Sequence, residues 1–597
     1  MHRKTIIDFK ELGQRYLFDE PLVELVAKTL DQVGPVIEKV QHYQQLGYYV
    51  VGYLSYEAAA FFDNALQTHN DRLGNEYLAY FTVHKTCQKK DLPLDYDSIT
   101  IPNQWVSATQ KEAYQKAIET IHHEMRQGNT YQVNYTIQLT QELNAADSFA
   151  IYNKLVVEQA AGYNAYIAHD EFAVISASPE LFFKQEGNQL TTRPMKGTTK
   201  RGVNTWLDQQ EHDWLQADGK NRSENMMIVD LLRNDMGKIC QTGSVCVDRL
   251  CEVEQYSTVW QMTSTIVGDL KADCDLIDIL TALFPCGSIT GAPKVSTMAI
   301  ITSLEPNPRG IYCGTVGICL PDGRRFFNVP IRTIQLSHNQ ATYGVGGGIT
   351  WQSKWEDEYE EVHQKTAFLY RHKQIFDLKT TAKVEHQKIA FLEQHLNRLK
   401  EAATYFAYPY DEKALQKQLS TYLENKNNAA YRLMIRLSKD GKISLSDQPL
   451  EPLSADFLTA QLSLQKKDVT ASPFTYFKTS YRPHIEQKSY EQLFYNQAGQ
   501  LLETSIGNLF VQLGQTLYTP PVAVGILPGL FRQELLATGQ AQEKEVTLAD
   551  LKEASAIFGG NAVRGLYPLN LELTHLDALL AKSQAQTATH LLLLRNL

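Results

Sequence analysis

The sequence predicts a chain of mixed α/β and α+β structure that is divided into two units of different fold. Its 597 residues exceed what one hydrophobic core normally holds. Strand-like runs alternate with amphipathic helical patterns through the first part. Near residues 371–376 the pattern starts afresh, and no internal repeat relates the two parts. We therefore expect one domain over 1–371 and another over 376–597.

The first part mixes both kinds of element. "YYVVGYLSYEAAAFF" and "AYIAHDEFAVISAS" are strand-like, whereas "ATQKEAYQKAIETIHHEMRQGN" has helical spacing and Gly128 as a plausible stop. Apolar residues recur at helical spacing over 224–236. The stretch "DEYEEVHQKTAFLYRHKQIF", residues 357–376, predicts a long helix that leads to the boundary.

The second part begins with two predicted helices, "FLEQHLNRLKEAATYFAY" and residues 411–425. "AYRLMIRLSKDGKISL" predicts two strands that turn at Asp440 and Gly441. Two glycine-containing turns follow, one entering a helix at Leu527–Leu530 and one in "FGGNAVRGLYPL".

Composition and charge argue against several functions. The net charge of −10 argues against sequence-independent nucleic-acid binding, which needs a basic surface. No stretch approaches the roughly 18 apolar residues of a spanning helix, and "MHRKTIIDFKEL" lacks the apolar region of a secretory signal. The eight cysteines contain no CxxC pair, which is typical of reduced thiols. We expect a cytoplasmic protein that binds neither nucleic acid nor membrane.

Charged side chains and glycine turns recur through the first part. Carboxylates from distant segments can hold Mg²⁺, glycine turns let backbone N–H groups approach a carboxylate, and arginine can grip a second carboxylate. These residue types indicate a site for a small polyanion with a divalent cation. The candidates are Glu180, Lys196, Glu224, Tyr312, Arg332, Gly346, Gly347, Gly348, Glu361 and Lys365.

Taken singly, these features have an ordinary structural explanation. Glu358, Glu361 and Lys365 lie on one helical face, and such a face is usually a solvated stripe of salt bridges. A basic loop such as "TRPMKGTTKRG" is usually a solvated surface as well.

The order of the motifs favours a functional site over this ordinary structural explanation. "DLLRND", "GSITGAPK" and "EYEE…K", in this order within residues 1 to 370, resemble the chorismate-utilising enzymes, which include anthranilate, aminodeoxychorismate, isochorismate and salicylate synthases. The resemblance implies a complex α/β sandwich around a deep cleft, with Glu224 and Glu361 as Mg²⁺ ligands. It implies that the substrate carboxylates are bound by Tyr312, Arg332, Lys365 and the backbone of Gly346, Gly347 and Gly348.

Two positions distinguish the subfamilies. Members that add water to chorismate carry a lysine base where this chain has Gln132, so isochorismate synthesis is not expected. Lys196 stands where anthranilate and isochorismate synthases carry alanine and aminodeoxychorismate synthases carry lysine. The resemblance implies that Lys196 attacks C2 of chorismate as the 4-hydroxyl leaves, that ammonia then enters at C4, and that Glu180 is the general acid. The chain departs from the family's usual pattern at Asn221, Gln261 and Cys286.

The second part carries the three requirements of pyridoxal phosphate chemistry. These are a lysine for the Schiff base, an acid for the pyridine nitrogen, and backbone amides with an arginine for the phosphate. In order over residues 376–597, "HLNRL", "FKTSYRP", "LLETSIGNLF" and the two glycine turns resemble fold-type IV pyridoxal phosphate enzymes, which include aminotransferases and 4-amino-4-deoxychorismate lyase. The resemblance implies that Lys478 carries the cofactor and moves a proton, and that Glu503 pairs with the ring nitrogen. It places around the phosphate Arg398, Ile526, Leu527, Asn561 and Ala562.

The two resemblances together imply a bifunctional enzyme that converts chorismate to 4-aminobenzoate with Mg²⁺ and pyridoxal 5′-phosphate. No cysteine lies in a glutaminase-like setting, so the chorismate site is expected to take ammonia from a separate glutamine amidotransferase subunit. A homodimer would form through the second domain. Two alternatives stay open: a synthase component with a silent docking domain, and an anthranilate synthase component with an aminotransferase-like domain.

Overall fold

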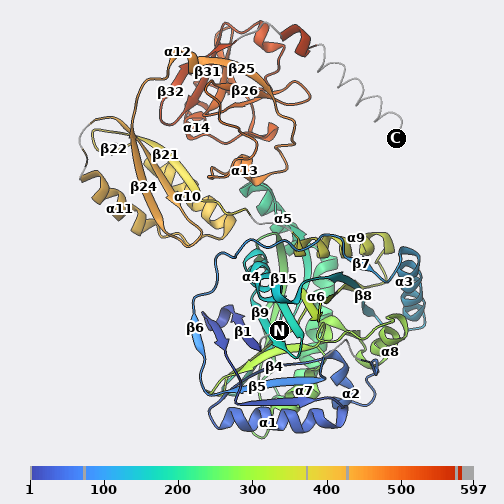
Figure 1. Ribbon diagram of the computed structural model, residues 1–597. Coiled ribbons are helices and arrows are strands. Elements are labelled where there is room, and N and C mark those ends of the chain that lie inside the picture. Colours follow the sequence, from blue (N-terminus) through green and yellow to red (C-terminus); the bar gives the residue numbers. More distant parts are fainter. Residues whose placement is uncertain are drawn as a thin grey trace. The chain divides into compact units, whose positions relative to one another are not determined.

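The computed structural model describes residues 3–71, 76–370, 374–424, 426, 429–571 and 576–580. The chain forms two compact units (Figure 1). The first comprises residues 1–200 and 211–373, and the second comprises 201–210 and 374–597. These ranges differ from the expected 1–371 and 376–597 mainly in the short segment 201–210.

Two antiparallel sheets form the centre of the first unit, each with ten strands within the described residues. The first sheet contains β1 (Lys4–Phe9), β2 (Arg15–Phe18), β6 (Gln88–Lys90), β7 (Val106–Ser107), β8 (Gln132–Glu142), β9 (Tyr163–His169), β10 (Phe172–Ser178), β16 (Gly291–Ala292), β19 (Thr333–Ser337) and β20 (Gln340–Ile349). The second sheet contains β3 (Val23–Ala27), β4 (Tyr49–Leu54), β5 (Ala79–His84), β11 (Leu181–Glu186), β12 (Gln189–Arg193), β13 (Met195–Lys200), β14 (Cys246–Gln255), β15 (Val259–Asp269), β17 (Thr315–Cys319) and β18 (Arg325–Asn328).

Buried apolar clusters define the layers of this unit. One cluster takes side chains from strands of both sheets, so the sheets pack face to face. Helices α3 (Lys111–Arg126) and α4 (Ser148–Gln159) cover the outer face of the first sheet. Helices α1 (Val33–Gln45), α6 (Gly219–Ile239) and α7 (Leu276–Leu283) cover the outer face of the second, and Figure 1 shows α1 lying along β4 and β5. The layers confirm the predicted α/β sandwich.

Most predicted elements of this unit are present. The hairpin β9–β10 and the helices α3 and α6 cover their predicted stretches, and Gly128 has φ +77 just beyond α3. Two predictions are wrong in extent. The run over 48–62 is extended only to Leu54, and its alanines then form a 3₁₀ turn and the short helix α2 (Ala59–Phe62). The helix predicted for 357–376 is α9 (Trp355–Thr366) with a 3₁₀ turn after it, and residues 371–373 lie outside the described ones.

A small antiparallel sheet opens the second unit, in the order β22 (Lys388–Ile389), β21 (Leu378–Glu385), β23 (Tyr431–Leu437) and β24 (Ile443–Pro449). One face packs on α10 (Leu392–Phe406) and α11 (Glu412–Glu424), which confirms the two predicted helices, although residue 425 lies outside the described ones. The β23–β24 hairpin turns at Asp440 and Gly441 as predicted, with φ +83 at Gly441.

A larger sheet completes the second unit. Its strands among the described residues are β25 (Thr459–Leu464), β26 (Gln492–Tyr495), β27 (Leu501–Thr504), β28 (Asn508–Leu513), β29 (Thr516–Thr519), β30 (Gln542–Glu543), β31 (Ala556–Asn561), β32 (Gly565–Pro568) and β33 (Asn570–Leu571). The predicted turn at Leu527–Leu530 leads into α14 (Leu530–Ala537), and "FGGNAVRGLYPL" forms the β31–β32 hairpin.

The segment 201–210 is built into the second unit. Val203 packs against the core beneath α10. The Tyr405 hydroxyl donates to the Gly202 carbonyl at 2.7 Å, and the Arg201 guanidinium lies 4.6 Å from the centre of the Tyr405 ring. The segment follows directly on β13, the strand that carries Lys196.

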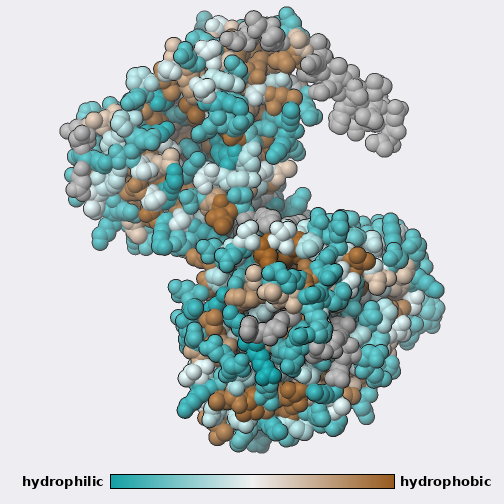
Figure 2. Space-filling view, viewed as in Figure 1, coloured by the Kyte–Doolittle hydropathy of each residue, from teal (hydrophilic) through white to brown (hydrophobic). Residues whose placement is uncertain are grey.

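Hydrophilic residues dominate the surface in Figure 2, with apolar residues in scattered patches. In the part of the chain that the structure describes, no helix has the length and apolar character that crossing a membrane requires.

Candidate functional site

Lys196 lies on β13, where the pairing with β15 shifts register between Met195 and Thr198. Gly197 has φ +93, which favours glycine, and an added Cβ would lie 3.0 Å from Asn221. Gln261 holds this turn, because its side-chain amide donates to the Gly197 carbonyl at 2.7 Å. Gln261 and Asn221 are two of the family departures, and both touch this turn.

The amine of Lys196 approaches the backbone of β20. A Cβ added at Gly348 would lie 3.2 Å from Lys196 Nζ and 2.1 Å from Gln132 Nε2. The absence of a side chain at Gly348 therefore makes room for both groups. Burial lowers the pKa of Lys196, and the neighbouring Lys365 lowers it further, against the opposing effect of Glu180. A lower pKa increases the fraction of neutral, nucleophilic amine.

Glu180 directly precedes β11, with 3% of its surface exposed. Its Oε1 has no hydrogen-bond partner within the described part of the chain. Burial raises the pKa of Glu180 to about 7, although Ser288, Lys196 and the Met195 amide oppose the shift. A carboxyl group with this pKa can donate a proton near neutral pH.

Glu224 on α6 and Glu361 on α9 interact electrostatically with each other and with Lys196. Burial raises the pKa of Glu224, and Glu361 raises it further, whereas Lys365, 2.7 Å from Glu361, lowers the pKa of Glu361. Within the described residues no three His, Cys, Asp or Glu side chains form a metal site. Two facing carboxylates still fit Mg²⁺, because this ion keeps several waters and accepts substrate oxygens.

The charged face of α9 lies against the glycine strand. Lys365 Nζ donates to the Gly346 carbonyl at 2.8 Å, and an added Cβ at Gly347 would lie 3.1 Å from Glu358 Oε2. This face is therefore packed on β20 and is not merely a solvated stripe. Gly346, Gly347 and Gly348 pair with β8 through Thr136, Tyr135 and Asn134.

Tyr312 and Arg332 are connected to the residues around Lys196 less directly. Tyr312 is buried, and an added Cβ at Gly344 would lie 2.3 Å from its ring, so it packs on β20 two residues before the glycine run. Arg332 has φ +53, an uncommon conformation for a residue with a side chain, and its guanidinium donates to Gln159 at 3.2 Å. Within the described residues, no hydrogen bond or ion pair joins either side chain to Lys196 or Glu180.

Two sequence motifs are joined by a buried ion pair. Lys294 of "GSITGAPK" lies 3.1 Å from Asp235 of "DLLRND", whose side chain is 4% exposed. Lys294 also donates to the Leu283 carbonyl at 3.3 Å. This pair joins the two motifs in the fold, and Lys238 is a second partner of Asp235 at 2.8 Å.

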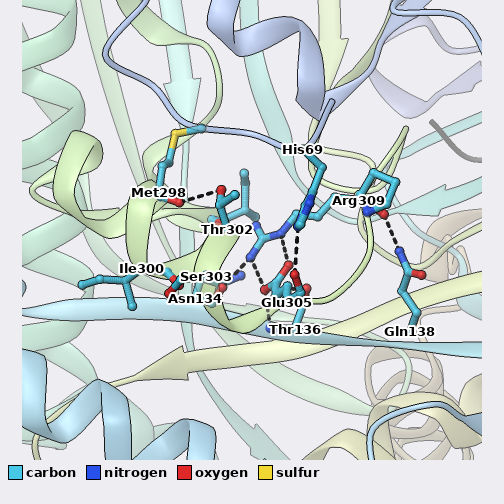
Figure 3. A network of polar contacts seen from close by, with 12 residues as sticks. His69, Asn134, Thr136, Gln138, Met298, Ile300, Thr302, Ser303, Glu305 and Arg309 are labelled. Carbon is cyan, nitrogen blue, oxygen red and sulfur yellow. Dashed lines mark hydrogen bonds and ion pairs between the residues drawn. The ribbon is translucent and has the colours of Figure 1, made fainter. Parts of the chain in front are cut away.

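A second buried ion pair holds the "GSITGAPK" turn in place (Figure 3). Glu305 and Arg309 are 2.7 Å apart and almost inaccessible. Arg309 also donates to the carbonyls of Ile289 at 2.8 Å and Asn134 at 2.7 Å, while Glu305 accepts from the Thr136 amide at 2.8 Å. The pair thereby fixes the "GSITGAPK" turn to β8. Sequence reasoning did not single out these residues, because a lone Glu and Arg carry no signal of their burial.

Lys478 lies in an extended segment beside β21. The Lys379 amide donates to the Lys478 carbonyl at 3.0 Å, and Thr479 bridges to Leu378. Burial lowers the pKa of Lys478 well below its ordinary value, and the positive charge of Arg398 lowers it further.

Several predicted cofactor residues meet in the second unit. Glu503 on β27 is 4% exposed, forms an ion pair with Arg482 at 2.7 Å and accepts from the Leu527 amide at 3.3 Å. Arg398 donates to the carbonyl of Pro528, next to Leu527. Ile526, the other predicted loop residue, is buried. A buried acid, an arginine and a loop before α14 fit the pyridine and phosphate ends of pyridoxal phosphate.

Asn561 and Ala562 lie in the β31–β32 turn. The Asn561 side chain accepts from the amides of Val563 and Arg564, each at 3.0 Å, and donates to the Ile506 carbonyl at 3.1 Å. In the described residues, no hydrogen bond joins this turn to Arg398 or Leu527. The phosphate contacts of Asn561 and Ala562 therefore remain a prediction.

Comparison with known proteins agrees with this geometry. The model of the chorismate binding enzyme family matches residues 3–371, and that of amino-transferase class IV matches 377–571. A probable aminodeoxychorismate synthase of Oryza sativa subsp. japonica is 39% identical over 42% of this chain and 28% of its own length. Aminodeoxychorismate synthase component 1 of Bacillus subtilis is 37% identical over 44% of this chain and 55% of its own.

The chain thus spans less than two thirds of either relative. Among solved structures, anthranilate synthase component I from Streptococcus pneumoniae has the same fold, with a TM-score of 0.52 at 24% identity over 60% of this chain and 92% of that one. The family model covers more than half of the sequence, and the chain is a member of the chorismate binding enzyme family.

Proposed function

We propose that this protein makes 4-aminobenzoate from chorismate in two steps, one in each unit. The observation that carries the proposal is the pair Lys196 and Glu180. An amine with a lowered pKa interacts electrostatically with a buried carboxyl group whose pKa is about 7, beside the glycine run of β20.

In the first step the Lys196 amine attacks C2 of chorismate and the 4-hydroxyl group leaves with a proton from Glu180. Ammonia then forms a bond to C4, and the amine of Lys196 leaves C2. The products are 4-amino-4-deoxychorismate and water. Glu180 suits the acid role because burial raises its pKa to about 7, which keeps protonated carboxyl groups present near neutral pH.

Glu224 and Glu361 would hold Mg²⁺ in this step, and the ion would neutralise a carboxylate of chorismate. Lys365, Arg332, Tyr312 and the Gly346–Gly348 backbone are the proposed contacts for the carboxylates.

Anthranilate synthesis is the rival first reaction. Lysine at position 196 opposes it, because alanine at this position resembles the anthranilate and isochorismate synthases. Gln132, next to Gly348, opposes water addition, since an amide cannot act as a base.

In the second step the C4 proton and the C3 enolpyruvyl group are removed, which yields pyruvate and aromatic 4-aminobenzoate. Bound pyridoxal phosphate supplies an electron sink for the electrons that the C4 proton leaves behind. Lys478 would hold the cofactor and accept the C4 proton, and its lowered pKa suits a base at neutral pH. Glu503 would pair with the pyridine nitrogen, and Arg398 with the Ile526–Leu527 loop would bind the phosphate. Asn561 and Ala562 are proposed to contact the phosphate as well.

The nitrogen would come from a separate glutamine amidotransferase; the Bacillus subtilis relative is named as component 1 of its synthase. The second unit could instead be a silent docking domain. The lowered pKa of Lys478 and the buried Glu503 favour an active site.

Incubation with chorismate, ammonium, Mg²⁺ and pyridoxal phosphate, followed by liquid chromatography, tests the proposal. It predicts 4-aminobenzoate and pyruvate in equal amounts. Aminodeoxychorismate alone would indicate a silent second unit, and anthranilate would refute the first step.

A further inference from the structure

Three cations stand side by side across the second unit's small sheet. In the antiparallel register Lys379 on β21 pairs with Arg436 on β23. On the other side of β21, the bridge between Leu378 and Thr479 places Lys478 opposite Lys379. Opposed residues of antiparallel strands point to the same face, with Cβ atoms about 4.5–5.5 Å apart. Lys478, Lys379 and Arg436 therefore form one row, which we term the cation row.

The cation row lies on the face opposite α10 and α11. Leu378, Val384, Leu433 and Ile435 of these strands point into the core beneath the helices. Lys379, whose position alternates with theirs, is only partly buried. Four residues further along each strand, Lys383 and Arg432 form a second pair of opposed cations on the same face.

This arrangement is costly without an anion. Like charges directly opposite each other destabilise a sheet. No ion pair reaches Lys379 or Arg436 within the described residues, whereas Lys383 at the far end pairs with Glu385 at 2.8 Å. The side chain of Arg436 contacts the Met434 sulfur at 3.1 Å, and Ser444 on β24 is the uncharged residue opposite it.

The acidic side chains near the cation row do not neutralise it. Glu503 is paired with Arg482 at 2.7 Å. Asp377, two residues before Lys379, raises the pKa of Tyr408 and forms no ion pair with Lys379 in the described part of the chain. Burial lowers the pKa of Lys379, and Arg482 and Arg436 lower it further, which indicates an excess of positive charge.

We propose that Lys379, with Arg436 beside it, binds a carboxylate of the second unit's substrate and so selects a dianionic substrate over a neutral amine. The inference rests on the proposed function, because it takes Lys478 as the residue at the reacting amine. Both carboxylates of 4-amino-4-deoxychorismate lie within a few bonds of its C4. One strand spacing, about 4.8 Å, separates Lys478 from Lys379. The cofactor phosphate is also an anion, but its proposed partners are Arg398, which donates to the Pro528 carbonyl, and the loop before α14.

Lys379→Gln tests the assignment, with Lys379→Arg as the charge-conserving variant. Lys442→Gln is the matched control, because Lys442 lies on the same lobe with an 84% exposed side chain. The full-length holoenzyme is supplied with 4-amino-4-deoxychorismate, and KM and kcat are measured. We expect KM to rise about 10- to 100-fold in Lys379→Gln, with a smaller rise in Lys379→Arg and no change in Lys442→Gln.

Two further measurements separate the possible outcomes. Titration of the apoprotein with pyridoxal phosphate should give the wild-type dissociation constant for Lys379→Gln, and weaker cofactor binding with unchanged KM would overturn the assignment in favour of a phosphate contact. Without ligand, Lys379→Gln should melt at the wild-type temperature or higher, because a like-charge contact is removed. A lower melting temperature would overturn it in favour of a structural lysine. A wild-type protein without lyase activity would refute the proposed function itself, whereas an active wild type with an unchanged KM in Lys379→Gln refutes only this inference.

Discussion

Replacing Glu180 by glutamine should reduce the pH dependence of the stability of the first unit. Glu180 has a pKa of about 7 in the folded protein, against an ordinary value of 4.5. The folded state therefore holds a proton that the unfolded state releases, and stability falls as pH rises from 4.5 through 7. At about 1.4 kcal/mol per pKa unit, the difference corresponds to about 3.5 kcal/mol over the full range across both pKa values. Glutamine cannot ionise, so Glu180→Gln should avoid this loss.

Urea denaturation at pH 5 and at pH 8 measures the effect. From pH 5 to pH 8, the free energy of unfolding of Glu180→Gln should rise by about 2.5 kcal/mol relative to that of the wild type. Glu186→Gln, at the exposed end of the same strand, should show the same change in the free energy of unfolding as the wild type. The same pH dependence in Glu180→Gln and wild type would refute the buried, proton-binding Glu180. The synthase rate of Glu180→Gln should also drop about 100-fold or more, since general acid catalysis is lost.

Three other substitutions probe the proposed sites. Lys478→Ala should lose the visible absorption of bound pyridoxal phosphate and stop the pathway at aminodeoxychorismate, while chorismate consumption stays near the wild-type rate; 4-aminobenzoate from this variant would contradict the lyase assignment. Gly348→Ala should reduce synthase kcat/KM about 100-fold, because its Cβ would lie 2.1 Å from Gln132 Nε2, and an unchanged steady-state rate would show that the strand can move aside. Glu361→Gln should raise the Mg²⁺ concentration needed for half-maximal activity about tenfold, and an unchanged Mg²⁺ titration would exclude Glu361 as a ligand.

Much of the fold could be predicted from the sequence, because periodicity reports which side chains are buried. The helices α3, α10 and α11 and the β23–β24 hairpin follow directly from their patterns. The end of α9 at Thr366 could not be predicted, since "AFLYRHKQIF" keeps an apolar spacing compatible with a helix. The place of 201–210 in the second unit depends on contacts such as Tyr405 to Gly202, between residues 203 positions apart.

The candidate site was only partly accessible from the sequence. Lys196 and Glu180 could be named because specific motifs surround them. The roles of Gln261, Arg309 and Lys379 could not, because each depends on the neighbour that folding supplies. Gln261 departs from the family pattern, yet it holds the turn after Lys196. Lys379 is an ordinary strand residue in sequence, and only the register places it between Lys478 and Arg436.

The covalent role of Lys196 is the central claim, and one comparison tests it most directly. Wild type, Lys196→Ala and Lys200→Ala are incubated with chorismate, ammonium and Mg²⁺, and aminodeoxychorismate and 4-aminobenzoate are measured by liquid chromatography. Lys200 lies four residues away on the same strand with an 82% exposed side chain, so it controls for a change of charge. We predict that Lys196→Ala forms neither product but still binds chorismate, and that Lys200→Ala behaves as wild type. Full synthase activity in Lys196→Ala would contradict the account.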